Sequence, residues 1–183
     1  ILWVLDLWPE SVTAGGNLKL KLIPKIINPL VKFIYNNSDK IFISSRAYFP
    51  SIMKQGIAKK RIMYFPQWVN SSFKPILEND NCFKHLIPNG FVVMFAGNIG
   101  ESQDFPSILE AAEILQKYNN IHWVILGDGR NAKWVEKQIK DRNLSNNIHM
   151  LGNFPSDSMP EFFSLSDLML VSLKKEYIFS LTV

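Results

Sequence analysis

Short apolar runs alternate with longer amphipathic segments along the second half of the chain. The apolar runs have the length of buried strands and lie at residues 91–97 (FVVMFAG), 121–127 (IHWVILG), 148–152 (IHMLG) and 168–173 (LMLVSL). Helical segments follow the first three runs, at residues 105–118, 128–144 and 160–167. Strands that alternate with helices predict right-handed crossovers and a parallel sheet.

The first 66 residues show a weaker form of the same pattern. ILWVLDLW (1–8) predicts a buried strand whose C-terminal end carries Asp6 to Glu10. Residues 18–37 have helical length, but Pro24 and Pro29 are expected to break or kink the helix. Further strands are expected at 38–45 and 61–66, with a helix between them that ends at Gly56.

Residues 67–90 have no clean period and are rich in Asn, Ser and Pro, which is typical of a linker. The fold class expected is therefore α/β, with two Rossmann-like parallel-sheet domains. The predicted boundaries are 1–66 for the first domain, 67–90 for the linker and 91–183 for the second domain.

Composition excludes several classes of protein. Cys82 is the only cysteine, so an internal disulfide and a cysteine-based zinc site are excluded, and a reducing cytoplasm is expected. No apolar run approaches the roughly 20 residues of a membrane-spanning helix. The net charge of +4 suits an anionic ligand or surface, but 20 basic and 16 acidic residues are scattered together, unlike a nucleic-acid-binding chain.

Four lysines, Lys19, Lys21, Lys25 and Lys32, lie in an apolar segment that ends in aromatic residues. Two interpretations stay open. The segment rests on the anionic inner face of the plasma membrane, or it is a core-packed helix with solvated lysines, which is the favoured interpretation.

Ligands of parallel α/β sheets bind beyond the carboxyl ends of the strands. The turn Gly97–Gly100 follows one strand directly, and its N–H groups could hold a diphosphate, although on spacing alone an ordinary tight turn is slightly favoured. Gly127, Asp128, Gly129 and Arg130 form a second such turn. It matches G-x-G-x-x-A, but the acid that a dinucleotide-binding site needs about 20 residues later is missing.

Other chemistry has little support. His85, His122 and His149 have no partner at the spacing of metal ligands, so core or edge positions are favoured and no metal is expected. No G-x-S-x-G motif is present, which argues against a hydrolase.

Several blocks together resemble glycosyltransferase family 4, of the GT-B fold. LDLWPESV, SDKIFISSRAYFPSIMKQGI and KKRIMYFPQWVNSSFKP are similar to the later half of the acceptor domain and the interdomain linker of that family. VMFAGNIGESQDFPSILEAAEIL, HWVILGDGRNAKWVEKQI and NIHMLGNFPSDSMPEFFSLSDLMLVSL resemble successive blocks of its nucleotide-sugar domain. The branch that looks most similar comprises bacterial amino-sugar transferases of O-antigen and capsule synthesis, of the L-fucosamine transferase type.

The resemblance implies roles for particular residues. The donor diphosphate would lie against both turns and Lys174, and the donor base against a short loop. Asp6 and Glu10 would face the donor sugar as catalytic residues, and the last residues would contact that sugar. The implied ligands are Gly97, Asn98, Ile99, Gly100, Gln103, Gly127, Asp128, Gly129 and Arg130 for the diphosphate, Asn153, Phe154 and Pro155 for the base, and Phe179, Ser180, Leu181 and Thr182 for the sugar.

The chain departs from the family pattern at the diphosphate site. Many members have an arginine and a lysine where this chain has Asn98 and Gln103, so the cation is either missing or supplied elsewhere, by Lys174 or Lys175. Family members usually have two glutamates eight residues apart in the last donor segment; the first would fall near Phe179–Thr182, where this chain has no acid, and the second would fall past Val183. The expectation is therefore a fragment, truncated at both ends and inactive by itself.

The function that the resemblance implies is transfer of an amino sugar from a UDP-sugar to a polyprenyl-diphosphate-linked saccharide, without cofactor or metal. Two alternatives stay open: a UDP-sugar 2-epimerase of GT-B architecture, and a non-catalytic nucleotide-binding module. A dehydrogenase is disfavoured because the ribose-binding acid is missing.

Overall fold

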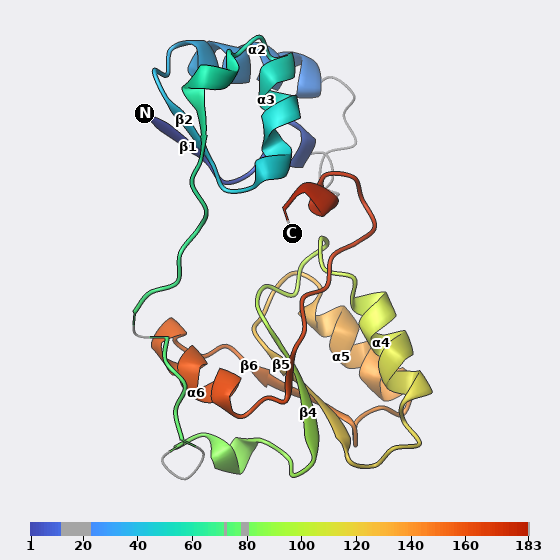
Figure 1. Cartoon of the computed structure of the whole chain (residues 1–183). Helices are drawn as coiled ribbons and strands as arrows, with labels where there is room; N and C mark the ends of the chain where they lie inside the picture. Colours follow the sequence, from blue (N-terminus) through green and yellow to red (C-terminus); the bar gives the residue numbers. More distant parts are fainter. Residues whose placement is uncertain (12–22, 72, 78–80, 183) are drawn as a thin grey trace. The chain divides into compact units, whose positions relative to one another are not determined.

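The structure is a computed structural model that describes residues 1–11, 23–71, 73–77 and 81–182 (Figure 1). The chain forms two compact units: unit 1 comprises Ile1–Trp68 and Leu173–Val183, and unit 2 comprises Val69–Ser172. Each unit has its own parallel sheet, so the predicted α/β class is confirmed. The division differs from the predicted boundaries at the C-terminal end, because residues 173–183 belong to unit 1 and not with residues 91–172.

Unit 1 contains three short parallel strands in the order β1 (Leu2–Val4), β2 (Ile41–Ile43) and β3 (Ile62–Tyr64). The described part of this unit includes the helices α2 (Ile23–Asn36) and α3 (Phe49–Lys54), with 3-10 turns η1 (Arg46–Tyr48), η2 (Lys59–Arg61) and η6 (Phe179–Leu181). Val31 and Tyr35 of α2 and Ile52 of α3 share one buried cluster with the β2 side chains. The apolar face of each helix therefore holds it on the sheet.

A break or a kink was predicted at Pro29; helix α2 continues through this residue, so the break does not occur. Pro24 is the second residue of the helix, where a missing N–H leaves no bond unmade. Beyond Pro29, burial of Val31 and Tyr35 stabilises the last turns, and the Arg61 guanidinium donates to the carbonyls of Tyr35 (2.9 Å) and Asn36 (3.0 Å). Tertiary packing therefore outweighs the local cost of the proline.

Burial, with a smaller contribution from Glu10, raises the pKa of Tyr35 to about 12. Because this pKa lies above the value of about 10 in the unfolded chain, Tyr35 stabilises the fold fully below pH 10, and that contribution is lost between about pH 10 and 12. From pH 10 to pH 12 the free energy of unfolding should fall in both proteins. We expect the fall to be about 2 kcal/mol smaller in Tyr35→Phe than in the parent. Urea titrations at both ends of the interval measure it, and equal losses in both proteins would contradict it.

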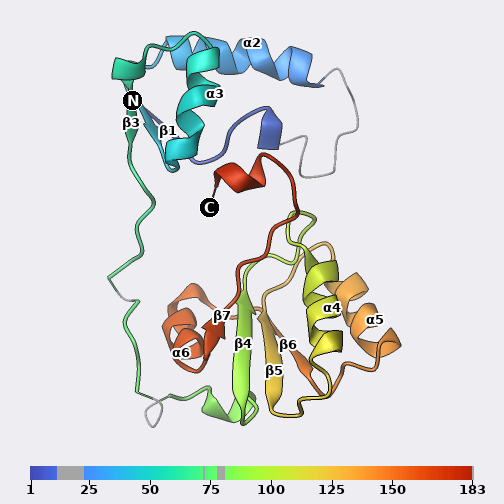
Figure 2. The same cartoon turned by 45° about the vertical axis from the view of Figure 1, so that its right-hand side comes forward.

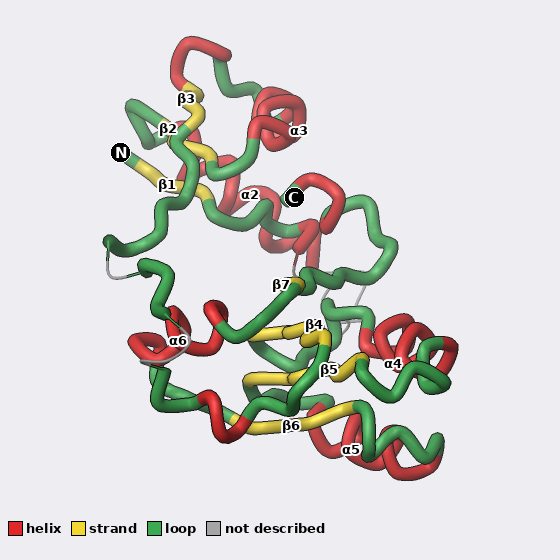
Figure 3. The backbone as a smooth tube through the Cα atoms, turned by 60° about the horizontal axis from the view of Figure 1, so that its bottom comes forward, coloured by secondary structure: helices red, strands yellow, loops and turns green. Residues whose placement is uncertain are grey.

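Unit 2 contains a four-stranded sheet in the order β6–β5–β4–β7, with all pairs parallel (Figures 2 and 3). The strands are β4 (Phe91–Ala96), β5 (Ile121–Leu126), β6 (Ile148–Gly152) and β7 (Leu168–Met169), which is shorter than the predicted 168–173. The helices are α4 (Phe105–Ile114), α5 (Ala132–Asp141) and α6 (Met159–Ser164), with turns η4 (Lys84–Leu86) and η5 (Ser156–Ser158). The alternation of strands and helices predicted for this half is confirmed.

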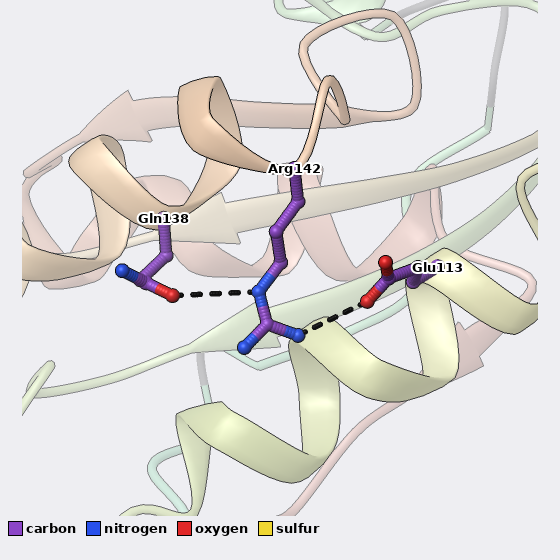
Figure 4. A network of polar contacts seen from close by, with 3 residues as sticks. All are labelled: Glu113, Gln138 and Arg142. Atoms are coloured by element: carbon purple, nitrogen blue, oxygen red, sulfur yellow. Dashed lines mark hydrogen bonds and ion pairs between the residues drawn. The ribbon is translucent and has the colours of Figure 1, made fainter.

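Both faces of the unit 2 sheet are covered, as parallel sheets require. Helices α4 and α5 bury Phe105 and Val135 against Trp123 and Ile125 on one face, and α6 buries Phe162 on the other (Figure 2). Arg142, just after α5, donates to Gln138 and forms an ion pair with Glu113 of α4 (3.1 Å), which joins the two helices (Figure 4). Among the described residues, no helix is long and apolar enough to cross a membrane.

Candidate functional site

The turns after β4 and β5 lie back to back in unit 2. The N–H of Gly97 donates to the Leu126 carbonyl (3.0 Å), and the N–H of Ile99 donates to the Asp128 carbonyl (2.9 Å). Gly127 has φ +129°, and a Cβ at this position would lie 1.9 Å from the carbonyl oxygen of Gly97. Only glycine fits there, so Gly127 allows the two turns to approach each other.

A pocket of about 310 Å³ lies at the carboxyl ends of β4, β5 and β6. It is lined by Gly97, Asn98, Leu126, Gly127, Asp128, Asn153, Phe154 and Met159. Six of these residues were named from the sequence, on three separate segments. Leu126 and Met159 were not: Leu126 ends the strand before a named turn, whereas nothing in the sequence indicates Met159.

The backbone donors of the first turn are less free than the sequence suggested. Several N–H groups of Gly97–Gly100 were expected to point toward one ligand, but that of Gly97 is bonded to Leu126 at the end of β5, and that of Ile99 is bonded to Asp128 of the second turn. The N–H of Gly100 donates to Oε1 of Gln103 (3.2 Å), and that of Gly129 donates to Oδ1 of Asp128 (2.7 Å). An anion at these two donors therefore has to replace a side-chain oxygen.

The other residues of unit 2 that were named for the diphosphate are not part of the pocket lining. Ile99 is fully buried and its side chain belongs to the core between the sheet and α4. Gly100 is buried behind the side chains of Asn98 and Gln103. Arg130 is exposed on the second turn.

Substitution of Gln103 tests directly whether an anion replaces its side-chain oxygen at the N–H of Gly100. We expect Gln103→Ala to strengthen binding of UDP by up to about fivefold, since one hydrogen bond of about 1 kcal/mol no longer has to be broken. Calorimetric titration of the variant measures this. Ser107→Ala is the matched control, because the Ser107 hydroxyl bonds to Asp104 and not to the turn. Weaker binding by Gln103→Ala would mean that the amide itself contacts the ligand.

The loop after β6 presents the residues named for the donor base. Phe154 lies in the pocket lining, and its ring packs on Phe162 (centroids 4.5 Å apart) and edge-on to Phe83 (5.5 Å). Asn153 and Pro155 are exposed on either side of it. A buried aromatic cluster therefore holds Phe154 in place at the edge of the pocket.

In unit 1, the two carboxylates named as catalytic follow β1. Asp6 and Glu10 are both exposed. The carbonyl of Leu5 accepts hydrogen bonds from the Tyr48 hydroxyl (3.0 Å) and the Ser44 hydroxyl (3.3 Å), which fixes the backbone beside Asp6. Burial is the main cause that raises the pKa of Tyr48, so its phenol stays protonated and able to donate.

The residues named for the donor sugar lie in unit 1, although the sequence assigned them to the second domain. Turn η6 (Phe179–Leu181) places Leu181 in the same buried cluster as Tyr48, and Thr182 donates to the Phe179 carbonyl (2.8 Å). Lys174 belongs to the same unit. Their contact with a sugar or a diphosphate stays a prediction.

Side chains able to bind a metal are dispersed in the part of the chain that the structure describes, where no three His, Cys, Asp or Glu side chains gather. Two of the three histidines do meet, however. His122 of β5 and His149 of β6 lie on adjacent strands, which their spacing in the sequence does not reveal.

The chain resembles known proteins in sequence. Residues 78–178, more than half of the chain, match the family model described as Glycosyl transferases group 1. A protein of Escherichia coli (strain K12), provisionally assigned as the colanic acid biosynthesis glycosyl transferase WcaI, is 27% identical over 148 residues, 76% of this chain and 35% of that protein. The probable glycosyltransferase WbjE of Pseudomonas aeruginosa is 26% identical over 181 residues, 94% of this chain. The chain spans 44% of WbjE, so it covers less than half of either relative.

Solved structures agree in fold. WaaG, a glycosyltransferase involved in lipopolysaccharide biosynthesis, superimposes on this chain with a TM-score of 0.72 at 14% identity. The superposition covers 96% of this chain and 50% of WaaG. Anabaena HepE, crystallised with UDP, has a TM-score of 0.70 at 14% identity over 92% of this chain and 45% of its own. The predicted GT-B type of fold is thereby confirmed. Together with the match over residues 78–178, this shows that the chain belongs to the glycosyl transferases group 1 family.

Proposed function

We propose that the pocket of unit 2 binds a UDP-sugar, and that the protein transfers an N-acetylamino sugar from it to a polyprenyl-diphosphate-linked saccharide of a cell-surface polysaccharide. The observation that carries the proposal is the meeting of two glycine turns and the Asn153–Phe154 loop around one pocket, at the carboxyl ends of a parallel sheet. Membership of the family supports the reaction type. The resemblance to O-antigen and capsule amino-sugar transferases supports the choice of sugar and acceptor.

In this proposal the two turns hold the diphosphate. Asn98 and the backbone of Gly97 and Gly127 contact it from the pocket lining, and the N–H of Gly100 becomes a donor when Gln103 moves aside. Helix α4 adds the positive end of its dipole. Lys174 supplies the cation that the turn lacks. The uracil lies against Phe154, with Asn153 and Pro155 beside it.

In the chemical step Asp6 positions or deprotonates the acceptor hydroxyl. As the hydroxyl oxygen bonds to the anomeric carbon, the bond between that carbon and the diphosphate oxygen breaks, and the hydroxyl proton passes to Asp6 or to the departing UDP. The N–H groups and the helix dipole then stabilise the charge that develops on UDP, without a metal ion. Glu10 assists at the acceptor, and Phe179–Thr182 contact the donor sugar.

Calorimetric titration with UDP, UDP-N-acetylglucosamine and NAD tests the donor site. We expect both UDP compounds to bind, and NAD to bind at least tenfold more weakly. Binding of NAD without UDP would overturn the proposal and make the Gly127–Arg130 turn a dinucleotide site. Analysis of the product separates transfer from epimerisation: transfer yields a lipid-linked glycan, whereas epimerisation releases a free sugar-nucleotide isomer.

We further propose that unit 1 contacts an anionic membrane, at the inner face of the plasma membrane. Charge is divided unequally: unit 1 has 12 basic and 4 acidic residues, a net +8, whereas unit 2 has 8 basic and 12 acidic residues, a net −4. Leu30 and Phe33 of α2 are 58% and 64% exposed, and Lys32 lies exposed between them. An apolar surface next to basic side chains suits an anionic lipid headgroup layer.

Sedimentation with vesicles tests this contact. We expect the chain to bind vesicles that contain phosphatidylglycerol and not vesicles of phosphatidylcholine alone, and Phe33→Asp to weaken binding at least tenfold. Met53→Asp is the matched control, since Met53 is 43% exposed on α3 of the same unit. Equal weakening by both substitutions would mean that charge alone, and not the α2 surface, drives association.

A further inference from the structure

His122 and His149 bring two imidazoles together on neighbouring strands. Nε2 of His149 lies 3.3 Å from Nδ1 of His122, and the ring centroids are 5.3 Å apart with the planes at 51°. Both side chains are half-buried. Each histidine is the second residue of its strand, β5 or β6, so the pair lies near the amino ends of the strands, away from the pocket at their carboxyl ends.

The separation of the two nitrogens matches that of two ligands on one metal ion. Zinc binds histidine nitrogen at about 2.0–2.1 Å with tetrahedral angles, which places two such nitrogens roughly 3.3–3.4 Å apart. In the structure the nitrogens face each other across a hydrogen bond. That hydrogen bond uses the N–H of one imidazole, so metal binding would move this proton to the other nitrogen of the same ring, and a rotation of the rings would then turn two lone pairs toward one point.

The two histidines would bind the ion through their neutral rings, since metals require neutral imidazole. Since no third His, Cys, Asp or Glu joins the pair among the described residues, water has to complete the coordination shell. Two nitrogen ligands suit Zn²⁺, Ni²⁺ or Cu²⁺ and not Mg²⁺ or Ca²⁺.

We propose that His122 and His149 form a two-histidine site for a transition-metal cation such as Zn²⁺. A bound ion would join β6, the strand at the sheet edge, to β5, and so stabilise unit 2. The site is separate from the donor pocket, and the proposal does not depend on the proposed function.

Calorimetric titration with zinc chloride and thermal unfolding with and without zinc test the site. We expect one Zn²⁺ per chain and a higher Tm with zinc. In His149→Ala and in His122→Ala the affinity should fall at least tenfold and the zinc-dependent shift of Tm should disappear. Far-ultraviolet circular dichroism of the metal-free variants shows whether they still fold, and His122→Asn keeps the proposal testable if an alanine variant does not.

Two controls separate this site from other zinc ligands. His85 is exposed, with Nδ1 2.9 Å from the Cys82 carbonyl, and the Cys82 thiol donates to Glu161. We expect His85→Ala and Cys82→Ser to bind zinc like the parent. Loss of binding in either control with binding kept in His149→Ala would overturn the proposal, as would no zinc-dependent shift of Tm in the parent.

Discussion

Gly127→Ala is expected to destabilise unit 2 by about 3–5 kcal/mol and to abolish binding of UDP. The new Cβ would lie 1.9 Å from the Gly97 carbonyl oxygen, and φ at +129° is unfavourable for alanine. The backbone strain accounts for about 1–3 kcal/mol. Relief of the clash separates the two turns and breaks the bonds from Gly97 to Leu126 and from Ile99 to Asp128, at about 1 kcal/mol each. Hydrogen exchange of the β4 and β5 amides and calorimetry with UDP measure the two effects.

Gly152→Ala separates the clash from the backbone strain. Gly152 also has a positive φ, +78°, but no heavy atom lies within 4 Å of the Cβ position. Strain alone should therefore cost about 1–2 kcal/mol, and UDP should still bind. If the two alanine variants lost equal stability, the close approach of the turns at Gly127 would not be what shapes the pocket.

The sequence was sufficient to locate the pocket because strand ends can be read locally. The apolar runs at 91–97, 121–127 and 148–152 end in glycines, and the carboxyl ends of parallel strands meet at one edge of the sheet. Gly97, Gly127 and Asn153 could thus be named together without knowing the order of the strands.

The hydrogen bonds within the site could not be predicted in the same way. Whether the N–H of Ile99 is available depends on the Asp128 carbonyl, which belongs to another turn. The position of η6 likewise depends on packing of Leu181 in the buried cluster of unit 1, which no local pattern indicates. The meeting of His122 and His149 depends on β5 and β6 being neighbours. The break predicted at Pro29 failed for the same reason, because packing of α2 on the sheet decides whether the helix continues.

Phe162→Ala is expected to destabilise unit 2 by about 3–5 kcal/mol, as truncation of a fully buried aromatic side chain does. Its ring stacks on Phe83 and packs on Phe154, both with centroids 4.5 Å apart, so the substitution also removes the support of the ring that lines the pocket. Affinity for UDP should therefore fall at least tenfold even where the variant is still folded. Phe91→Ala is the matched control: Phe91 is 44% exposed on β4, and its loss should cost less than about 1 kcal/mol. If Phe162→Ala lost stability as expected but bound UDP like the parent, Phe154 would not contact the base, and the uracil would have to lie elsewhere along the pocket.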